Sequence, residues 1–142
     1  MNPIRLSSEP AAKQEDRTFI ENAINNYNVR VTGVEDYHPL NIFLRGQDGT
    51  LLGGILGHCW GGWLHITTLW LAESVRGQGY GTQLVHAAET EAQSHGCHHA
   101  YLETFSFQAR PFYETLGYHV IGHLADYPPG HAHYILQKLL SV

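Results

Sequence analysis

A glycine-rich segment at residues 75–82, Val-Arg-Gly-Gln-Gly-Tyr-Gly-Thr, most strongly limits what this chain can fold into. An apolar run at 63–71 precedes it, and apolar residues at helical spacing follow it from Thr82 to about His95. This pattern predicts a strand, a tight loop and a helix in succession. The start of a helix presents unbonded backbone N–H groups and a partial positive charge, and glycines let a ligand approach that backbone closely. The segment therefore predicts a cradle for phosphate groups.

Size, charge and cysteine content narrow the class of protein. The 142 residues are enough for a proper core, and we expect a single domain over residues 2–140. The formal net charge of −5 argues against a nucleic-acid partner, whose phosphates normally meet a basic surface. No apolar run reaches the ~18 residues of a membrane span and no signal peptide is visible, so we expect a cytoplasmic protein without a membrane partner. Cys59 and Cys97 lack a paired spacing, which predicts two reduced, buried thiols.

Two motifs, in a fixed order, resemble those of one family. Arg76, Gly79 and Gly81 match the Arg/Gln-x-x-Gly-x-Gly/Ala signature of the GNAT superfamily of N-acetyltransferases. Further along, residues 112–118, Phe-Tyr-Glu-Thr-Leu-Gly-Tyr, resemble the family's Leu-Tyr-Glu-Lys-Leu-Gly-Phe element. A Rossmann-type dinucleotide loop is disfavoured, because it needs a third glycine at another spacing and an acidic residue about 20 positions further on. A tight strand-to-helix turn that simply needs small residues is the structural alternative.

The rest of the pattern predicts the order of elements. Ser7 and Pro10 indicate a helix start, Asp48-Gly49 indicates a hairpin, and glycines within residues 51–60 indicate bulges or close packing. The expected elements are a strand at 2–7, a helix at about 10–27 with an apolar stripe, mostly loop at 29–40, strands at 40–45, 51–60 and 63–71, a helix at 82–95, a strand at 99–105, a helix at 108–116, and strands at 118–124 and 133–140. This order resembles the complete GNAT fold, an α/β (α+β) fold whose central, mixed and mostly antiparallel sheet is flanked by helices and has splayed central strands.

The resemblance implies a binding site for acetyl-CoA as co-substrate, with no metal. The backbone of the central strand would pair with the pantetheine amides, the N–H groups of the glycine loop would hold the pyrophosphate, and Arg76 would flank it. Ser106 stands where the family usually has Asn, and as a shorter hydrogen-bonding residue it leaves that pantetheine contact in doubt. The implied donor-site residues are Leu69, Trp70, Leu71, Arg76, Gly77, Gln78, Gly79, Tyr80, Gly81, Thr82, Ser106 and Phe112.

Amine acetylation requires removal of a proton from the ammonium, stabilisation of an oxyanion and protonation of a thiolate. Tyr113 matches the family tyrosine that protonates the thiolate, and a phenol, with a pKa near ~10, suits that task. The backbone N–H of Leu71 is a candidate oxyanion donor. Candidates for the base are His65 and Glu103, on the two splayed strands, and Glu73 at a strand end. A structural role for each, or a water chain in place of a base, stays open.

The acceptor is the least defined part. Tyr37, His58, Trp60 and Trp63 are candidates to line its pocket and hold a cation, although such residues often belong to a core. We expect direct transfer to a primary amine of a small molecule. The alternatives are an acyl-CoA-binding sensor without turnover and a protein or peptide N-acetyltransferase. A homodimer is a further expectation, since family members are often dimers.

The histidines suggest no metal site. The His-rich segments at 95–99 and 131–133 lack zinc-site spacing, which predicts solvated histidines.

Overall fold

The computed structural model describes residues 3–140, and the chain divides between Glu35 and Asp36 into two compact units. The first unit holds one helix, α1 (Gln14–Thr32). The strand predicted at 2–7 is wrong for the described residues, because residues 3–9 have no regular structure, and Asn2 lies outside the described residues. Ile4 and Leu6 are fully exposed, and a strand forms only where a neighbour accepts its backbone hydrogen bonds.

Helix α1 begins and ends later than the predicted range of 10–27. Glu15 and Asp16 lie in its first turn, where negative charge favours a helix start. The helix continues through residues expected to be loop and ends at Gly33, whose φ of 71° is left-handed and whose N–H donates to the carbonyl of Val29. No residue of α1 is buried, so its apolar stripe is exposed.

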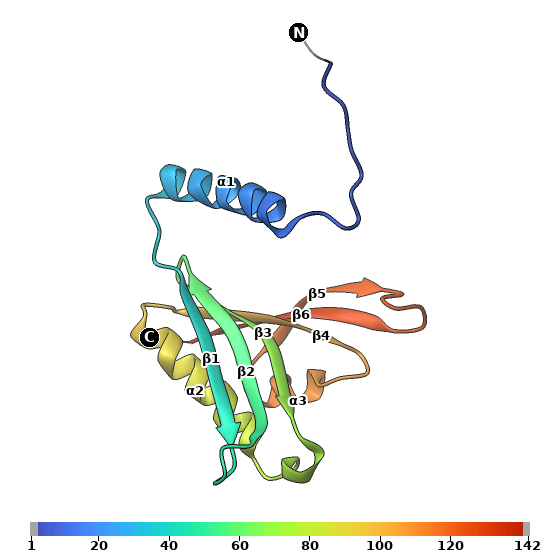
Figure 1. Ribbon diagram of the computed structural model, residues 1–142. Helices are drawn as coiled ribbons and strands as arrows, with labels where there is room; N and C mark the ends of the chain where they lie inside the picture. The colour runs from blue at the N-terminus through green and yellow to red at the C-terminus, as the bar shows by residue number, and fades with distance from the viewer. Residues whose placement is uncertain (1–2, 141–142) are drawn as a thin grey trace. The chain divides into compact units, whose positions relative to one another are not determined.

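The second unit is built on a six-stranded sheet with the order β1-β2-β3-β4-β6-β5 (Figure 1). β3 and β4 pair in parallel and the other neighbours pair antiparallel, which confirms the predicted mixed, mostly antiparallel sheet. The ends of the predicted elements in this unit agree with the observed ones to within two residues, and the short helix η1 was not predicted. The strands are β1 (His38–Arg45), β2 (Leu51–Trp60), β3 (Trp63–Leu71), β4 (His99–Phe105), β5 (His119–Ala125) and β6 (Ala132–Leu139), and the helices are η1 (Glu73–Val75), α2 (Tyr80–Ser94) and α3 (Arg110–Thr115).

The two central strands part half-way along their length. β3 and β4 pair only from Trp63↔His99 to Ile66↔Leu102, and Figure 1 shows the two halves of the sheet running in different directions beyond this point. Thr67 is an extra residue opposite β2, a bulge that turns β3 where the pairing ends. Gly57 permits it, because a Cβ there would lie 2.3 Å from the carbonyl oxygen of His65. The predicted splay is confirmed.

The two faces of the sheet differ in burial. Along β4, Ala100, Leu102 and Thr104 are buried on the face that carries α2, whereas Glu103 and its alternate neighbours lie on the open face. On the covered face the buried Glu89 of α2 accepts hydrogen bonds from Lys138 Nζ on β6 at 2.9 and 3.1 Å and from the hydroxyl of Tyr118 at 2.8 Å. Cys59 and Cys97 are buried and not disulfide-bonded, as predicted. Within residues 3–140, no helix combines the length and apolar content needed to cross a bilayer.

Candidate active site

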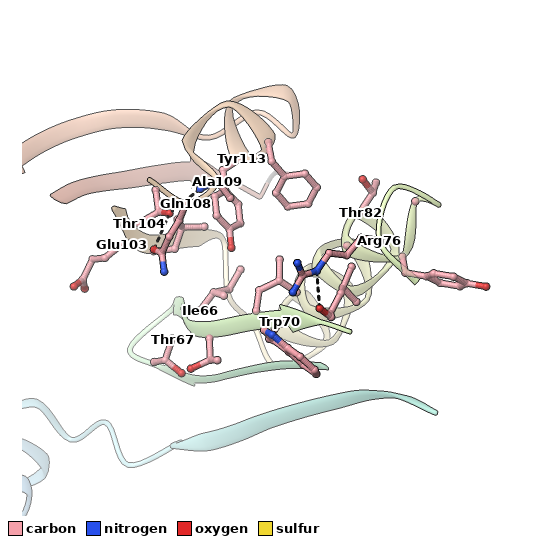
Figure 2. Close-up of a pocket in the computed structure, with 18 of the residues that line it drawn as sticks. Ile66, Thr67, Trp70, Arg76, Thr82, Glu103, Thr104, Gln108, Ala109 and Tyr113 are labelled. Carbon is pink, nitrogen blue, oxygen red and sulfur yellow. Dashed lines mark hydrogen bonds between the residues drawn. The ribbon is translucent and has the colours of Figure 1, made fainter. Parts of the chain in front are cut away.

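A pocket of about 960 Å³ opens where β3 and β4 part, and α3 and the glycine loop before α2 complete its walls (Figure 2). Backbone groups of β3 beyond Ile66 have no β4 partner, so an extended ligand can pair with them. Most of the predicted site residues line this pocket: Leu69, Trp70, Leu71, Arg76, Gly77, Gly79, Tyr80, Gly81, Thr82, Glu103, Phe112 and Tyr113.

Four of the residues predicted for the acetyl-CoA site or for catalysis do not line the pocket. The side chain of Gln78 donates to the carbonyl of Ser74 at 3.2 Å. The hydroxyl of Ser106 accepts a hydrogen bond from the backbone N–H of Ala132 at 3.0 Å, which ties the end of β4 to β6. Glu73 lies in η1, and His65 lies on the open face of the sheet beside Glu103.

The glycine loop has the properties of an anion cradle. Gly77 and Gly79 have φ values of 73° and 88°, and these left-handed conformations favour glycine. Helix α2 starts directly after them, with no acidic residue in its first turn and no side-chain cap, so its first N–H groups are available to a ligand. Arg76 Nε donates to the carbonyl of Leu71 at 2.9 Å, which holds the guanidinium at the loop. This loop is therefore suited to hold a phosphate or diphosphate group.

Tyr113 is buried in the wall opposite β3. Figure 2 shows its hydroxyl directed into the space between the two strands, with Arg76 and Glu103 at opposite ends of the pocket. Burial raises the pKa of Tyr113 to about 12, so the hydroxyl keeps its proton at neutral pH. Gln108 Oε1 accepts the backbone N–H of Phe105 at 3.0 Å and so braces the turn between β4 and α3. Gln108 was not among the site residues predicted from the sequence.

The structure brings two of the candidate bases together and adds a third side chain. Glu103 lies between two histidines, with Oε1 3.4 Å from His65 Nε2 and Oε2 3.2 Å from His133 Nε2. His133 is buried, so the expectation that it is solvated was wrong. It lies on β6 opposite Phe105 of β4, and only the antiparallel register places it there. In the sequence, only the alternation of side chains along β6 could have indicated which face of the sheet His133 occupies.

Both histidines present Nε2 to an oxygen of Glu103. Burial, followed by the neighbouring His58, lowers the pKa of His65, and the partly opposing effect of Glu103 is smaller. The Nδ1 atom of His133 is buried without a hydrogen-bond partner among residues 3–140. Nε2 of His133 faces a carboxylate oxygen, which can only accept, so this nitrogen is the donor of the hydrogen bond. Glu103 therefore receives two N–H donors, and its side chain is still 42% exposed.

The predicted acceptor aromatics gather near His65 on the open face and do not line the pocket. His58 stacks on Tyr37 with centroids 5.4 Å apart and meets the ring of His65 edge-on at 5.3 Å. Trp63 stacks on His99 at 4.6 Å. Trp60 pairs through its backbone with Trp63.

This fold and pocket agree with comparisons to known proteins. A family model described as the acetyltransferase (GNAT) family matches residues 6–118. The chain belongs to the GNAT family. Relatives of this GNAT protein include the blasticidin-S acetyltransferase of Streptomyces morookaense, 38% identical over 79% of this chain and 85% of the relative. Another is the acetyltransferase Atu2258 of Agrobacterium fabrum, which is 35% identical over 89% of this chain and 93% of the relative.

Solved structures show the same similarity. A crystal structure from Agrobacterium tumefaciens matches this GNAT chain with a TM-score of 0.90 and 33% identity, over 96% of this chain and 99% of the other. An acetyltransferase from Bacillus cereus matches with a TM-score of 0.82 and 32% identity, over 94% of this chain and 97% of the other. This GNAT protein is an acetyl-CoA-dependent acetyltransferase. Among residues 3–140, no group of three or more His, Cys, Asp or Glu side chains is placed to hold a metal ion.

Proposed function

We propose that this GNAT enzyme transfers the acetyl group of acetyl-CoA directly to a primary amine of a small molecule. The observation that carries the proposal is the order of groups along one pocket, with the glycine loop and Arg76 at one end, Tyr113 in the middle and Glu103 at the other. The relative named for blasticidin-S supports a small-molecule acceptor.

The donor half of the pocket fits acetyl-CoA, which supplies the activated thioester carbonyl. The N–H groups at the start of α2, with Arg76, would hold the diphosphate. The backbone of Leu69, Trp70 and Leu71 would pair with the pantetheine amides, because this part of β3 has no β4 partner. Holding the thioester between two strands fixes its orientation toward an incoming amine, and orientation of this kind lowers the barrier substantially.

Proton transfer is assigned to His65 and Tyr113. His65 lies beside Glu103 and outside the pocket lining, so it would take the ammonium proton through a bridging water molecule. A neutral His65 that donates Nε2–H to Glu103 has Nδ1 left to accept that proton, and the carboxylate stabilises the imidazolium that forms. The Tyr113 hydroxyl, directed into the pocket, donates to the leaving thiolate. A thiolate that is shielded from water in the pocket has its own pKa raised by desolvation, which brings it closer to that of the phenol.

A comparison of acceptors tests this proposal. The enzyme is supplied with acetyl-CoA and either a panel of small primary amines or peptides with free N-termini and lysines, and CoA release is followed with a thiol reagent. We expect kcat/KM values for the best small amines to exceed those for every peptide. Acetylation of peptides alone would refute the small-molecule assignment. CoA binding without release in any reaction would indicate a sensor and refute the assigned turnover.

A further inference from the structure

A cluster of five aromatic rings borders the Glu103 end of the pocket. We call it the aromatic platform, and it consists of Phe105, Phe107, Tyr127, His131 and His133. Phe105 is its centre, stacked on Phe107 at 5.2 Å and 11° and in contact with Tyr127 at 5.3 Å and His133 at 4.6 Å. Tyr127 stacks on His133 at 4.9 Å and 28°, and Phe107 meets His131 edge-on at 5.0 Å.

The platform is exposed and yet held in place. The side chains of Phe107 and Tyr127 are among the exposed large apolar ones, at 56% and 49%. Ser106 N–H donates to the carbonyl of Ala132 at 2.7 Å, and Ala132 N–H donates back to the Ser106 hydroxyl at 3.0 Å. These two bonds fasten the loop that carries Phe107 to the hairpin that carries Tyr127. Two large rings kept rigid at a surface form a preorganised stacking site.

Glu103, the carboxylate at this end of the pocket lining, lies next to the platform. Glu103 and Phe105 alternate along the same face of β4, and Glu103 Oε2 lies 3.2 Å from Nε2 of His133, itself a platform ring. Each carboxylate oxygen has a histidine neighbour, and an ionised carboxylate has about four acceptor positions in all. Glu103 can therefore accept further hydrogen bonds from a cation that lies on the platform.

We infer that the aromatic platform and Glu103 bind a planar cationic group of the acceptor, of the amidinium, guanidinium or protonated heteroaromatic class. The inference rests on the proposed function, because it describes the acceptor of that reaction. Flat rings attract cations through their faces and stack on other flat groups. A carboxylate recognises the paired N–H donors of an amidinium through charge-assisted hydrogen bonds. The acceptor then carries two functions, the amine that is acetylated near Tyr113 and a planar cation that is anchored beyond Glu103.

Matched probes test this inference. 4-(Aminomethyl)benzamidine carries a planar cation on a flat ring, 4-(aminomethyl)cyclohexanecarboxamidine keeps the cation without the flat ring, and 4-methylbenzylamine keeps the ring without the amidinium. Their Kd values are measured by calorimetry in the presence of CoA, and their kcat/KM values with acetyl-CoA. We expect the benzamidine to have the lowest Kd and the highest kcat/KM.

Variants of the platform give the second comparison. Phe107→Leu and Tyr127→Leu should each raise the Kd of the benzamidine about threefold to fivefold, and Glu103→Gln should raise it about tenfold or more. The Kd of acetyl-CoA should not change in the two leucine variants. Phe43→Leu is the matched control, since Phe43 is a half-exposed ring on the edge strand β1 and lies outside both the pocket lining and the platform.

The experiments distinguish failure of this inference from failure of the proposed function. Equal Kd values for the three probes, or leucine variants that bind the benzamidine as the wild type does, overturn the inference and leave the proposed function intact. Leucine variants that change only the oligomeric state, measured by light scattering, show that a second copy covers the platform and also overturn it. If the benzamidine binds through the platform but no small amine is acetylated, the proposed function fails, and with it the assignment of this ligand as an acceptor.

Discussion

Replacement of Tyr113 by Phe isolates the hydroxyl that points into the pocket. The ring packs against Phe112 and Tyr118 and is retained, so we expect the free energy of unfolding to change by less than about 1 kcal/mol. Burial raises the pKa of Tyr113 to about 12, above the ~8.5 of a free thiol, so the hydroxyl stabilises the thiolate first of all as a hydrogen-bond donor. A hydrogen bond to a charged group contributes about 1.5–3 kcal/mol. This corresponds to a fall in kcat of about 10-fold to 150-fold.

The assay follows CoA release at saturating amine and acetyl-CoA, and calorimetry gives the Kd of acetyl-CoA. That Kd should stay within about twofold of the wild-type value, because the hydroxyl meets the thiolate and not the bound thioester. Tyr134→Phe removes a hydroxyl in the same unit that does not line the pocket and serves as the matched control. An unchanged kcat, when solvent viscosity has no effect on the rate, would remove Tyr113 from the mechanism. A large rise in the Kd of acetyl-CoA would reassign it to donor binding.

Contacts within the second unit lead to four further predictions. Lys138→Met leaves the buried Glu89 carboxylate without its ammonium partner and should lower the free energy of unfolding in urea by about 3 kcal/mol, whereas the double variant with Glu89→Gln should recover part of the loss. Because the pKa of His65 is lowered from 6.5, kcat/KM should persist as the pH falls through 6.5 and decline only below it. The free energy of unfolding should decrease over the same acidic range, since the unfolded chain then binds the proton that the folded His65 does not. Gly57→Ala should cost about 2 kcal/mol or more, measured by thermal unfolding, because its Cβ would meet the carbonyl of His65.

The half of the pocket that we propose binds acetyl-CoA could be located from the sequence because its determinants are local. Gly77 and Gly79 adopt conformations that glycine favours, and helix α2 starts at the next residue, so a short motif defines both the turn and the free N–H groups. Tyr113 follows a short pattern on α3 in the same way. Six of the seven predicted strands are present in the sheet, since strand alternation and the Asp48-Gly49 turn are short-range signals. The strand expected at 2–7 does not form among the described residues.

The acceptor half could not be predicted to the same extent because it depends on register. Glu103 and His133 are far apart in the sequence and meet only because β6 lies antiparallel beside β4. The bounds of α1 were missed for another reason. An apolar stripe with periodic spacing suggested where the helix lies, but the acidic first turn and the left-handed Gly33 determine where it begins and ends.

One half of the pocket is lined mainly by backbone groups and the other mainly by side chains, so substitutions affect specificity at the two ends differently. The donor half presents mainly backbone N–H and C=O groups of β3 and the glycine loop, so most side-chain changes there leave the hydrogen-bonding groups in place. The other end presents side chains from β3, β4, β6 and two loops, so a substitution at Phe107 or Tyr127 changes the surface directly. Because the strands part after Ile66, the two halves share little beyond Tyr113 and the strand edges. Changes at the platform should therefore alter acceptor choice while the affinity for acetyl-CoA is retained.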